Sequence, residues 1–340
     1  MKTKPLVIGL VIAVLAFYFT FRNVTLKEFM DSFAAVNYVY LIPMVILTVA
    51  TYVARVYRWR LLLAPLKKMR AAQLYSPLMV GFMGNLLPAR AGEFIRAYLV
   101  GTQHNISISG SFATVVVERG FDTLIVLGMF GWLLAFHADI FSSEVQWSGV
   151  SLEDLAFNFG ILALGLVAVL FAFVYLMLFQ RSRVTRLVQW AVKPLPRKWH
   201  EKTEGLMERF SEGLMSVRDT GLLVKIFLYS LLVWGLILAS YYSLYWAYDL
   251  RDKSAASVVM VVLMICIFIS AFPTPGFVGS FQAGILVGLH GIMQEAEVAA
   301  VSFGMMAWGV NVVIMSLGGV YFILRERLSV RQLVEAEKEA

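Results

Sequence analysis

The chain carries, at residues 84–96, the sequence Gly84-Asn85-Leu86-Leu87-Pro88-Ala89-Arg90-Ala91-Gly92-Glu93-Phe94-Ile95-Arg96. This stretch follows an apolar run in a protein that is 60% hydrophobic and has a mean hydropathy of +0.76. Irregular backbone at membrane depth is tolerated only where protein covers it or water reaches it, and ionisable groups there usually serve a function. The stretch therefore predicts the wall of a polar cavity inside a bilayer.

The composition of the whole chain indicates an integral membrane protein. Only 15% of its 340 residues are charged, whereas soluble domains carry about 25%. Apolar runs of about 18 or more residues, each long enough to cross a bilayer, recur along the sequence. Six runs predict spanning helices: 5–21, 38–64, 111–136, 155–179, 222–248 and 298–324. The first run has no small-residue cleavage site after it, so we interpret it as a retained helix and not as a signal peptide.

The distribution of charge predicts the orientation of these helices. Lys and Arg gather in the loop at 67–70, in the segment 180–220 and after residue 324, whereas the loop 137–154 is acidic. Cytoplasmic loops collect Lys and Arg, so we expect a multi-pass protein of the inner (cytoplasmic) membrane with both termini cytoplasmic. The 180–220 segment predicts a basic amphipathic connector, which either lies in the headgroup layer or packs on the protein.

Two further apolar segments, 71–101 and 254–291, are interrupted by proline and glycine. With both flanking regions cytoplasmic, the first must enter and leave on one side, and its arm 93–101 extends only about 13 Å as a helix. It predicts a re-entrant hairpin; the alternative is an ordinary span followed by an outer loop. The second segment mirrors it from the outer side, although its first arm is long enough to cross fully.

The order span, span, hairpin, span then occurs twice, within residues 1–136 and 155–324, with opposite starting sides. We predict a single all-α transmembrane domain, 1–340, built as an inverted-topology repeat, a plan common among secondary transporters. The motif Pro88-x-x-x-Gly92 is echoed by Pro275-x-x-x-Gly279. The predicted hinge residues of the two tips are Pro88, Gly92, Pro273, Pro275, Gly276 and Gly279.

The charged residues around the first tip predict an anion site. The planar guanidinium of Arg90 or Arg96 suits a phosphate, and Glu93 would neutralise an arginine or suit a helix start. Glu118 and Asp122 lie one helical turn apart and face the same side. The alternatives are an internal Arg–Glu pair that only locks the hairpin, and a proton relay. The predicted substrate-binding set is Asn85, Arg90, Glu93, Arg96, Glu118, Arg119 and Asp122, with Gln282 as a polar residue of the second hairpin.

Other polar and aromatic residues are expected at the membrane boundaries. Snorkelling explains three arginines at the inner end of the second span, with a substrate role as the alternative. Aromatic residues near the outer end of the 222–248 run predict an interfacial belt. The arginines are Arg55, Arg58 and Arg60, and the belt residues are Tyr241, Tyr242, Tyr245 and Trp246.

Several functional classes are not expected. One cysteine and four widely spaced histidines give no disulfide framework and no metal-ligand spacing, so we predict no metal and no cofactor. No phosphate-binding glycine loop or nucleophile elbow is present, which favours a protein that is not an enzyme. We expect a membrane-lipid substrate and no nucleic-acid partner, and a homo-oligomer stays open.

The motifs resemble those of the lysylphosphatidylglycerol synthase transmembrane-domain family, which includes the flippase domain of the multiple peptide resistance factor. The resemblance rests on Asn85-x-x-Pro88-Ala89-Arg90-x-Gly92-Glu93-x-x-Arg96, Val117-Glu118-Arg119-x-x-Asp122, Arg58-Trp59-Arg60 and Pro273-x-Pro275-Gly276-x-x-Gly279, in order along nearly the whole chain. One departure is Gln282, where the family pattern commonly has glutamate. The resemblance implies lipid translocation rather than lipid synthesis.

These observations predict a flippase that moves a lipid with a phosphate-bearing headgroup between leaflets. The lipid would be an aminoacyl- or glyco-phospholipid or a polyprenyl-phosphate-linked sugar. Two alternatives stay open: a membrane-embedded glycosyl- or phosphoryl-transferase acting on a lipid, and a scaffold that recruits partners through the 180–220 segment.

Overall fold

The computed structural model describes residues 21–86, 91–138 and 208–328, together with scattered positions at 11–18 and 140–205. The helices are α2 (Leu26–Ala34), η1 (Tyr38–Tyr40), α3 (Leu41–Leu63), η2 (Ala71–Gln73), α4 (Tyr75–Gly84), α5 (Gly92–His104), α6 (Ile108–Phe136), η5 (Leu214–Arg218), α10 (Thr220–Ala247), α11 (Ala255–Ala271), η6 (Pro275–Phe277), α12 (Ser280–Leu286), η7 (Val287–Ile292) and α13 (Glu297–Glu326). Two short strands, β1 (Gln146–Trp147) and β2 (Val150–Ser151), pair antiparallel in the predicted outer loop.

Four of the six predicted spanning helices are confirmed as helices long and apolar enough to cross a membrane. They cover Tyr38–Leu63, Ile108–Phe136, Thr220–Ala247 and Glu297–Glu326, each within a few residues of the predicted bounds. The other two predicted spans, 5–21 and 155–179, lie largely outside the described residues.

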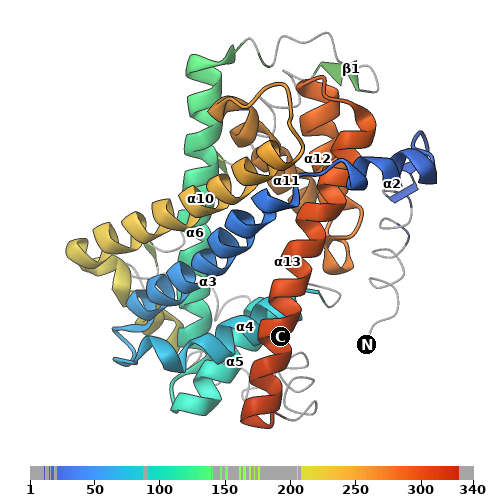
Figure 1. Cartoon of the computed structure of the whole chain (residues 1–340). Coiled ribbons are helices and arrows are strands. Elements are labelled where there is room, and N and C mark those ends of the chain that lie inside the picture. The colour runs from blue at the N-terminus through green and yellow to red at the C-terminus, as the bar shows by residue number, and fades with distance from the viewer. Residues whose placement is uncertain are drawn as a thin grey trace.

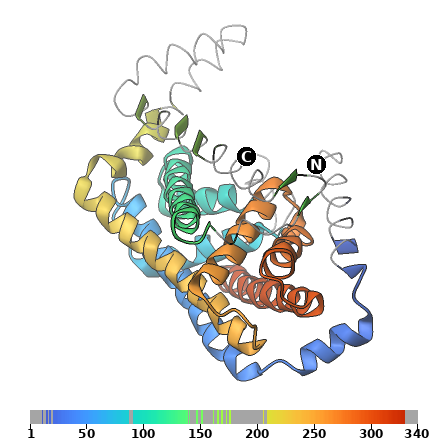
Figure 2. The same ribbon diagram turned by 90° about the horizontal axis from the view of Figure 1, so that it is seen from above.

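The α3 and α10 helices run side by side and antiparallel. Tyr40 stacks on Trp246 at one end of the pair, with ring centroids 6.2 Å apart, and Tyr57 stacks on Tyr229 toward the other, at 6.3 Å. Figures 1 and 2 show this pair lying diagonally across one side of the long helices α6 and α13. The pair therefore covers one side of the bundle, whereas the two hairpins pack mainly on α13 and α6.

The predicted hairpin at 71–101 consists of the two short helices α4 and α5. Their 10 and 13 residues extend about 15 and 20 Å at 1.5 Å per residue, less than the ~30 Å hydrocarbon layer. The helices touch through glycine: a Cβ added to Gly92 would overlap the carbonyl oxygen of Gly81 and lie 2.5 Å from Asn85 Oδ1. Small residues at the contact allow this close approach of the two backbones.

The second hairpin joins α11 to α12 through an irregular tip. Gly276 and Gly279 have φ values of 60° and 84°, in the left-handed region that favours glycine. A Cβ added to Gly276 would lie 3.8 Å from Leu86 Cδ2, which belongs to the tip of the first hairpin. Figure 1 shows α4–α5 at one end of α13 and α11–α12 at the other, so the two tips meet between the ends of the long helices.

The core is divided along the length of the helices. One cluster of buried apolar residues gathers around Tyr245 and Phe303, and another around Trp59 and Leu78. Leu214 of η5 is fully buried in the second cluster. The described end of the predicted connector, 208–218, therefore packs on the protein, which is one of the two alternatives considered for it; the rest of 180–220 lies largely outside the described residues.

Candidate functional site

Arg58 of α3 lies at the centre of a buried charged cluster. Its Nη1 donates to Asp122 Oδ1 at 2.6 Å and to Ser230 Oγ at 3.0 Å, and its Nη2 donates to Glu118 Oε1 at 2.8 Å. Trp234 Nε1 also donates to Asp122 Oδ1, at 3.2 Å. Arg58 and Glu118 have no exposed surface. The cluster therefore joins α3, α6 and α10 through a fully desolvated ion pair.

Arg96 brings the α5 helix into the same cluster. Its Nη1 lies 3.1 Å from Glu118 Oε2, and its guanidinium carbon lies 5.2 Å from the centre of the Trp59 ring. The Trp59 indole is itself fixed, because its Nε1 donates to Thr114 Oγ1 at 3.0 Å. Although Arg96 is only 2% exposed, its Nε and Nη2 donate to no partner in the part of the chain that the structure describes.

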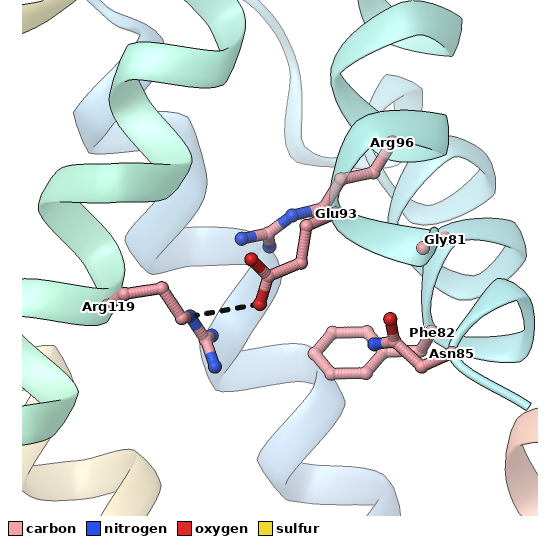
Figure 3. Close-up of a pocket in the computed structure, with 7 residues that line it drawn as sticks. Gly81, Phe82, Asn85, Glu93, Arg96 and Arg119 are labelled. Atoms are coloured by element: carbon pink, nitrogen blue, oxygen red, sulfur yellow. Dashed lines mark ion pairs between the residues drawn. The ribbon is translucent and has the colours of Figure 1, made fainter. Parts of the chain in front are cut away.

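Arg119 connects the buried cluster to a pocket. Its Nη2 lies 2.9 Å from Glu118 Oε1 and 3.0 Å from Asp122 Oδ2, whereas its Nε lies 3.5 Å from Glu93 Oε1 without forming a hydrogen bond. The side chains of Arg119 and Glu93 are 37% and 36% exposed, so this pair lies at the opening of the pocket. Figure 3 shows both side chains pointing into the gap between α5 and α6.

The pocket has an empty volume of about 190 Å³, including its open side. Its lining residues are Gly81, Phe82, Asn85, Gly92, Glu93, Arg96 and Arg119. Only about 10 Å³ of this space is enclosed, which is room for about one water molecule, so in this conformation the pocket is far smaller than the ~300–1,000 Å³ of typical small-molecule sites. Asn85 Oδ1 is buried and accepts from no described residue, which leaves it available to a ligand.

The charges and unpaired donors of the site favour an anion. Among the described residues near the pocket, four arginines (Arg55, Arg58, Arg96 and Arg119) outnumber three acids (Glu93, Glu118 and Asp122), which leaves this set with a net charge of +1. The first turn of α5 contributes Gly92 and Glu93 to the pocket, and no side chain of the described residues caps this helix. Guanidinium donors beside a helix N-terminus are chemically suited to a phosphate oxygen.

The structure brings together six of the seven predicted substrate-binding residues, with Asn85 directly after α4 and the other five on α5 and α6. The seventh, Arg90, lies outside the described residues, as does the predicted hinge Pro88. Gln282 is not part of this cluster: it is 1% exposed, and its Oε1 accepts the Gly279 N–H at 2.8 Å, which caps α12. Hinge motion at either tip stays a prediction.

The expectation that Arg58 snorkels to the membrane surface is wrong. Its side chain points inward because two carboxylates on α6 and a hydroxyl on α10 compensate its charge. Arg60 does lie near the surface and stacks on Tyr57, whereas Arg55 is packed over Phe82, 5.1 Å from the ring centre. Arg58 lies seven residues after Thr51, on the buried face of α3 that also carries Thr48 and Tyr52; this pattern was the signal available in the sequence.

Comparison with known proteins identifies the family. A sequence profile described as "Lysylphosphatidylglycerol synthase TM region" matches residues 6–329, nearly the whole chain. The chain belongs to the lysylphosphatidylglycerol synthase transmembrane-region family. This confirms the resemblance seen in the motifs. No solved structure matches the chain.

Two curated proteins that are similar to this chain carry different descriptions. Glycosyltransferase AglD of Haloferax volcanii is 23% identical over 356 residues, covering 99% of this chain and 57% of the relative. A UPF0104 membrane protein of Methanothermobacter thermautotrophicus is 28% identical over 247 residues, covering 67% of this chain and 68% of the relative. The chain thus spans little more than half the length of the glycosyltransferase that it resembles.

These names correct one expectation from the sequence. The prediction that the chain is not an enzyme is wrong as an exclusion, because one relative is named a glycosyltransferase and the family is named after a synthase. The missing glycine loop and nucleophile elbow exclude only the enzymes that depend on those motifs. The family and its relatives support a membrane protein with a function related to lipids.

Proposed function

We propose that this family member binds the phosphate of a lipid headgroup between α4, α5 and α6 and moves that headgroup from one leaflet to the other. The observation that carries the proposal is Arg96, which is 98% buried beside the pocket yet keeps Nε and Nη2 free of described partners. Although Glu118 pairs with Nη1 of Arg96, leaving the two other buried donor nitrogens without a hydrogen bond is costly, and a bound phosphate would offset that cost. The substrate would be an aminoacyl- or glyco-phospholipid or a polyprenyl-phosphate-linked sugar.

The contacts between helices support an inverted repeat as the basis of this movement. The helices of the first half correspond to those of the second half in order: α3 to α10, α4 to α11, α5 to α12 and α6 to α13. When each helix is replaced by its counterpart, each main helix–helix contact becomes another contact that the structure contains. The pair α4–α13 becomes α11–α6, α5–α6 becomes α12–α13, and α3–α10 becomes itself. Such pseudo-symmetry is the usual basis of alternating access, with the site near the repeat interface. The proposed halves are 1–136 and 155–324, in an inner membrane with both termini cytoplasmic.

Arg96→Gln tests the site. Glu118 keeps Arg58 and Arg119 as partners, so the fold should persist, while the pocket loses its buried donors. Since a hydrogen bond to a charged group contributes about 1.5–3 kcal/mol, we expect headgroup transfer to slow about ten-fold or more. Transfer of fluorescent phosphatidylglycerol in proteoliposomes measures this, with circular dichroism to check folding. We expect the same loss for Arg90→Ala.

The matched control is Arg325→Gln, which removes an exposed arginine in the last turn of α13. It should transfer lipid at the wild-type rate. A diacylglycerol analogue without phosphate should not be accelerated by either protein. Unchanged phosphatidylglycerol transfer by a folded Arg96→Gln variant would contradict the proposed phosphate site.

A second candidate function is transfer of a sugar to a lipid, and the name of the Haloferax volcanii relative favours it. Glu93, part-exposed at the opening of the pocket beside Arg119, would be the acid or base. Reconstituted protein given a radiolabelled sugar nucleotide and polyprenyl phosphate should then form a labelled lipid, and Glu93→Gln should form about 10²-fold less. Translocation without labelled product would favour the first function.

A further inference from the structure

The α2 helix is built differently from the spanning helices. It has nine residues, none of them buried, and its capping box makes it a stable short helix: Glu28 N–H donates to Thr25 Oγ1, and Thr25 N–H donates to Glu28 Oε2 at 2.9 Å. The bonds from Thr25 hold the pKa of Glu28 below its usual value. The ionised Glu28 therefore contributes its full stabilisation of the cap at pH values above the ordinary pKa of a glutamate carboxyl. This stabilisation is lost as the pH falls through the lowered pKa of Glu28.

Two hydrogen bonds fix how α2 is rotated about its axis. Ser32 Oγ lies 2.7 Å from Ser302 Oγ of α13, and just before the helix Asn23 Nδ2 donates to Glu297 Oε1 at 3.0 Å. Figure 1 shows α2 lying across α13, not along it. One side of α2 is therefore held against the first turns of α13, while the helix axis crosses the long helices.

The rest of the α2 surface divides into an apolar and a polar side. At 100° per residue, Leu26 and Met30 share one side and are 77% and 59% exposed. Lys27 and Asp31 share the next side, and both are exposed. A helix that meets protein on one side, has bare apolar residues on the second and charges on the third fits a boundary between lipid and water.

Aromatic residues place this boundary at the same level of the molecule. Tyr38, in the turn that follows α2, is 51% exposed, and Tyr242 and Trp246 of α10 are 39% and 42% exposed. Tyr and Trp with one exposed face gather where hydrocarbon meets headgroups. Tyr241 and Tyr245, also predicted as belt residues, are instead buried in the core. The exposed belt and α2 thus lie at the same end of the helices.

We propose that α2 binds the lipid surface of the leaflet at the Glu297 end of α13, with Leu26 and Met30 inserted at the boundary between headgroups and acyl chains. Arg22 and Lys27 balance Glu28 and Asp31, so the net charge of this segment is zero. Binding would therefore come from buried apolar area and not from attraction to anionic lipids. This inference does not depend on the proposed function.

Site-specific fluorescence tests the proposal. Cys266, the one cysteine, is first replaced by serine in the full chain. Single cysteines at Leu26 and Met30, with matched controls at Lys27 and Asp31, then carry an environment-sensitive dye in phosphatidylcholine vesicles. Lipids with a nitroxide near the headgroup should quench the first two labels at least about three-fold more than the controls, whereas aqueous iodide should quench mainly the controls. Added phosphatidylglycerol or high salt should leave both patterns unchanged.

Three outcomes would overturn the proposal. Equal iodide quenching at Met30 and Asp31 would place the whole helix in water. Strong quenching by lipids that carry the nitroxide at the end of their acyl chains would place α2 at the bilayer centre. Disulfide cross-linking between Met30→Cys chains, with no lipid quenching at either apolar position, would mean that a second copy of the chain covers this side.

Discussion

Arg58→Met is expected to destabilise the protein by about 3–5 kcal/mol, because it leaves two buried carboxylates without their central cation. Arg58 Nη1 lies 2.6 Å from Asp122 Oδ1, and its Nη2 lies 2.8 Å from Glu118 Oε1, in a site with almost no exposed surface. Arg119 and Arg96 remain near Glu118, yet neither replaces the bond that ties α3 to α6. Chemical or thermal unfolding of the protein in a defined detergent measures the loss.

Two further variants make this prediction specific. Arg60→Met, two residues along the same helix, removes a cation that stacks on Tyr57 and is only partly buried, so its effect should stay within about 0.5 kcal/mol. Adding Asp122→Asn to Arg58→Met should restore part of the stability, because one uncompensated charge is then removed. Similar losses for Arg58→Met and Arg60→Met would show that the buried ion pair does not hold the helices together.

Gly92→Ala is expected to force apart the two helices of the first hairpin. The added methyl group would overlap the carbonyl oxygen of Gly81 in α4 and lie 2.5 Å from Oδ1 of Asn85, the residue directly after α4. Overpacking at such a contact costs about 1–3 kcal/mol. Because Gly92 and Asn85 also line the pocket, the variant should lose headgroup transfer as well as stability, and both are measured on the same preparation.

Gly128→Ala is the matched control for this prediction. Gly128 is also within a helix, α6, but a Cβ built there meets nothing within 4 Å. The substitution should be neutral or stabilise the helix by about 0.5–1 kcal/mol, since alanine loses less backbone entropy on folding. If Gly92→Ala were as well tolerated as Gly128→Ala, the close contact of α4 with α5 would not be needed.

The parts of the fold that depend on local pattern could be predicted from the sequence. Apolar length is sufficient to locate a spanning helix, and the four described spans begin and end within a few residues of the predicted bounds. The hairpin at 71–101 followed from the same property, because its second arm is too short to cross a bilayer. The partition of 254–291 into α11, a glycine turn, α12 and η7 was harder, since its first arm is apolar and 17 residues long.

Most charged residues of the site could be predicted from the sequence, but the central position of Arg58 could not. Glu93, Arg96, Glu118 and Arg119 stand out because they interrupt apolar sequence, and the structure places them together. Arg58 sits near a helix end where snorkelling is the ordinary outcome, and only the approach of α6 and α10 turns it inward. The fate of a long charged side chain is decided by tertiary partners, which a single sequence does not display.

The contact between Leu86 and Gly276 bears on how tightly the barrier is sealed. A Cβ built on Gly276 would lie 3.8 Å from Leu86 Cδ2 and 3.9 Å from the Leu86 carbonyl oxygen, so only a few ångströms separate the two turns. If the hairpins face opposite compartments as proposed, this apolar contact separates the water on one side of the membrane from the water on the other side. A charged residue at position 86 would then draw water into this contact and let protons and small ions leak through the protein.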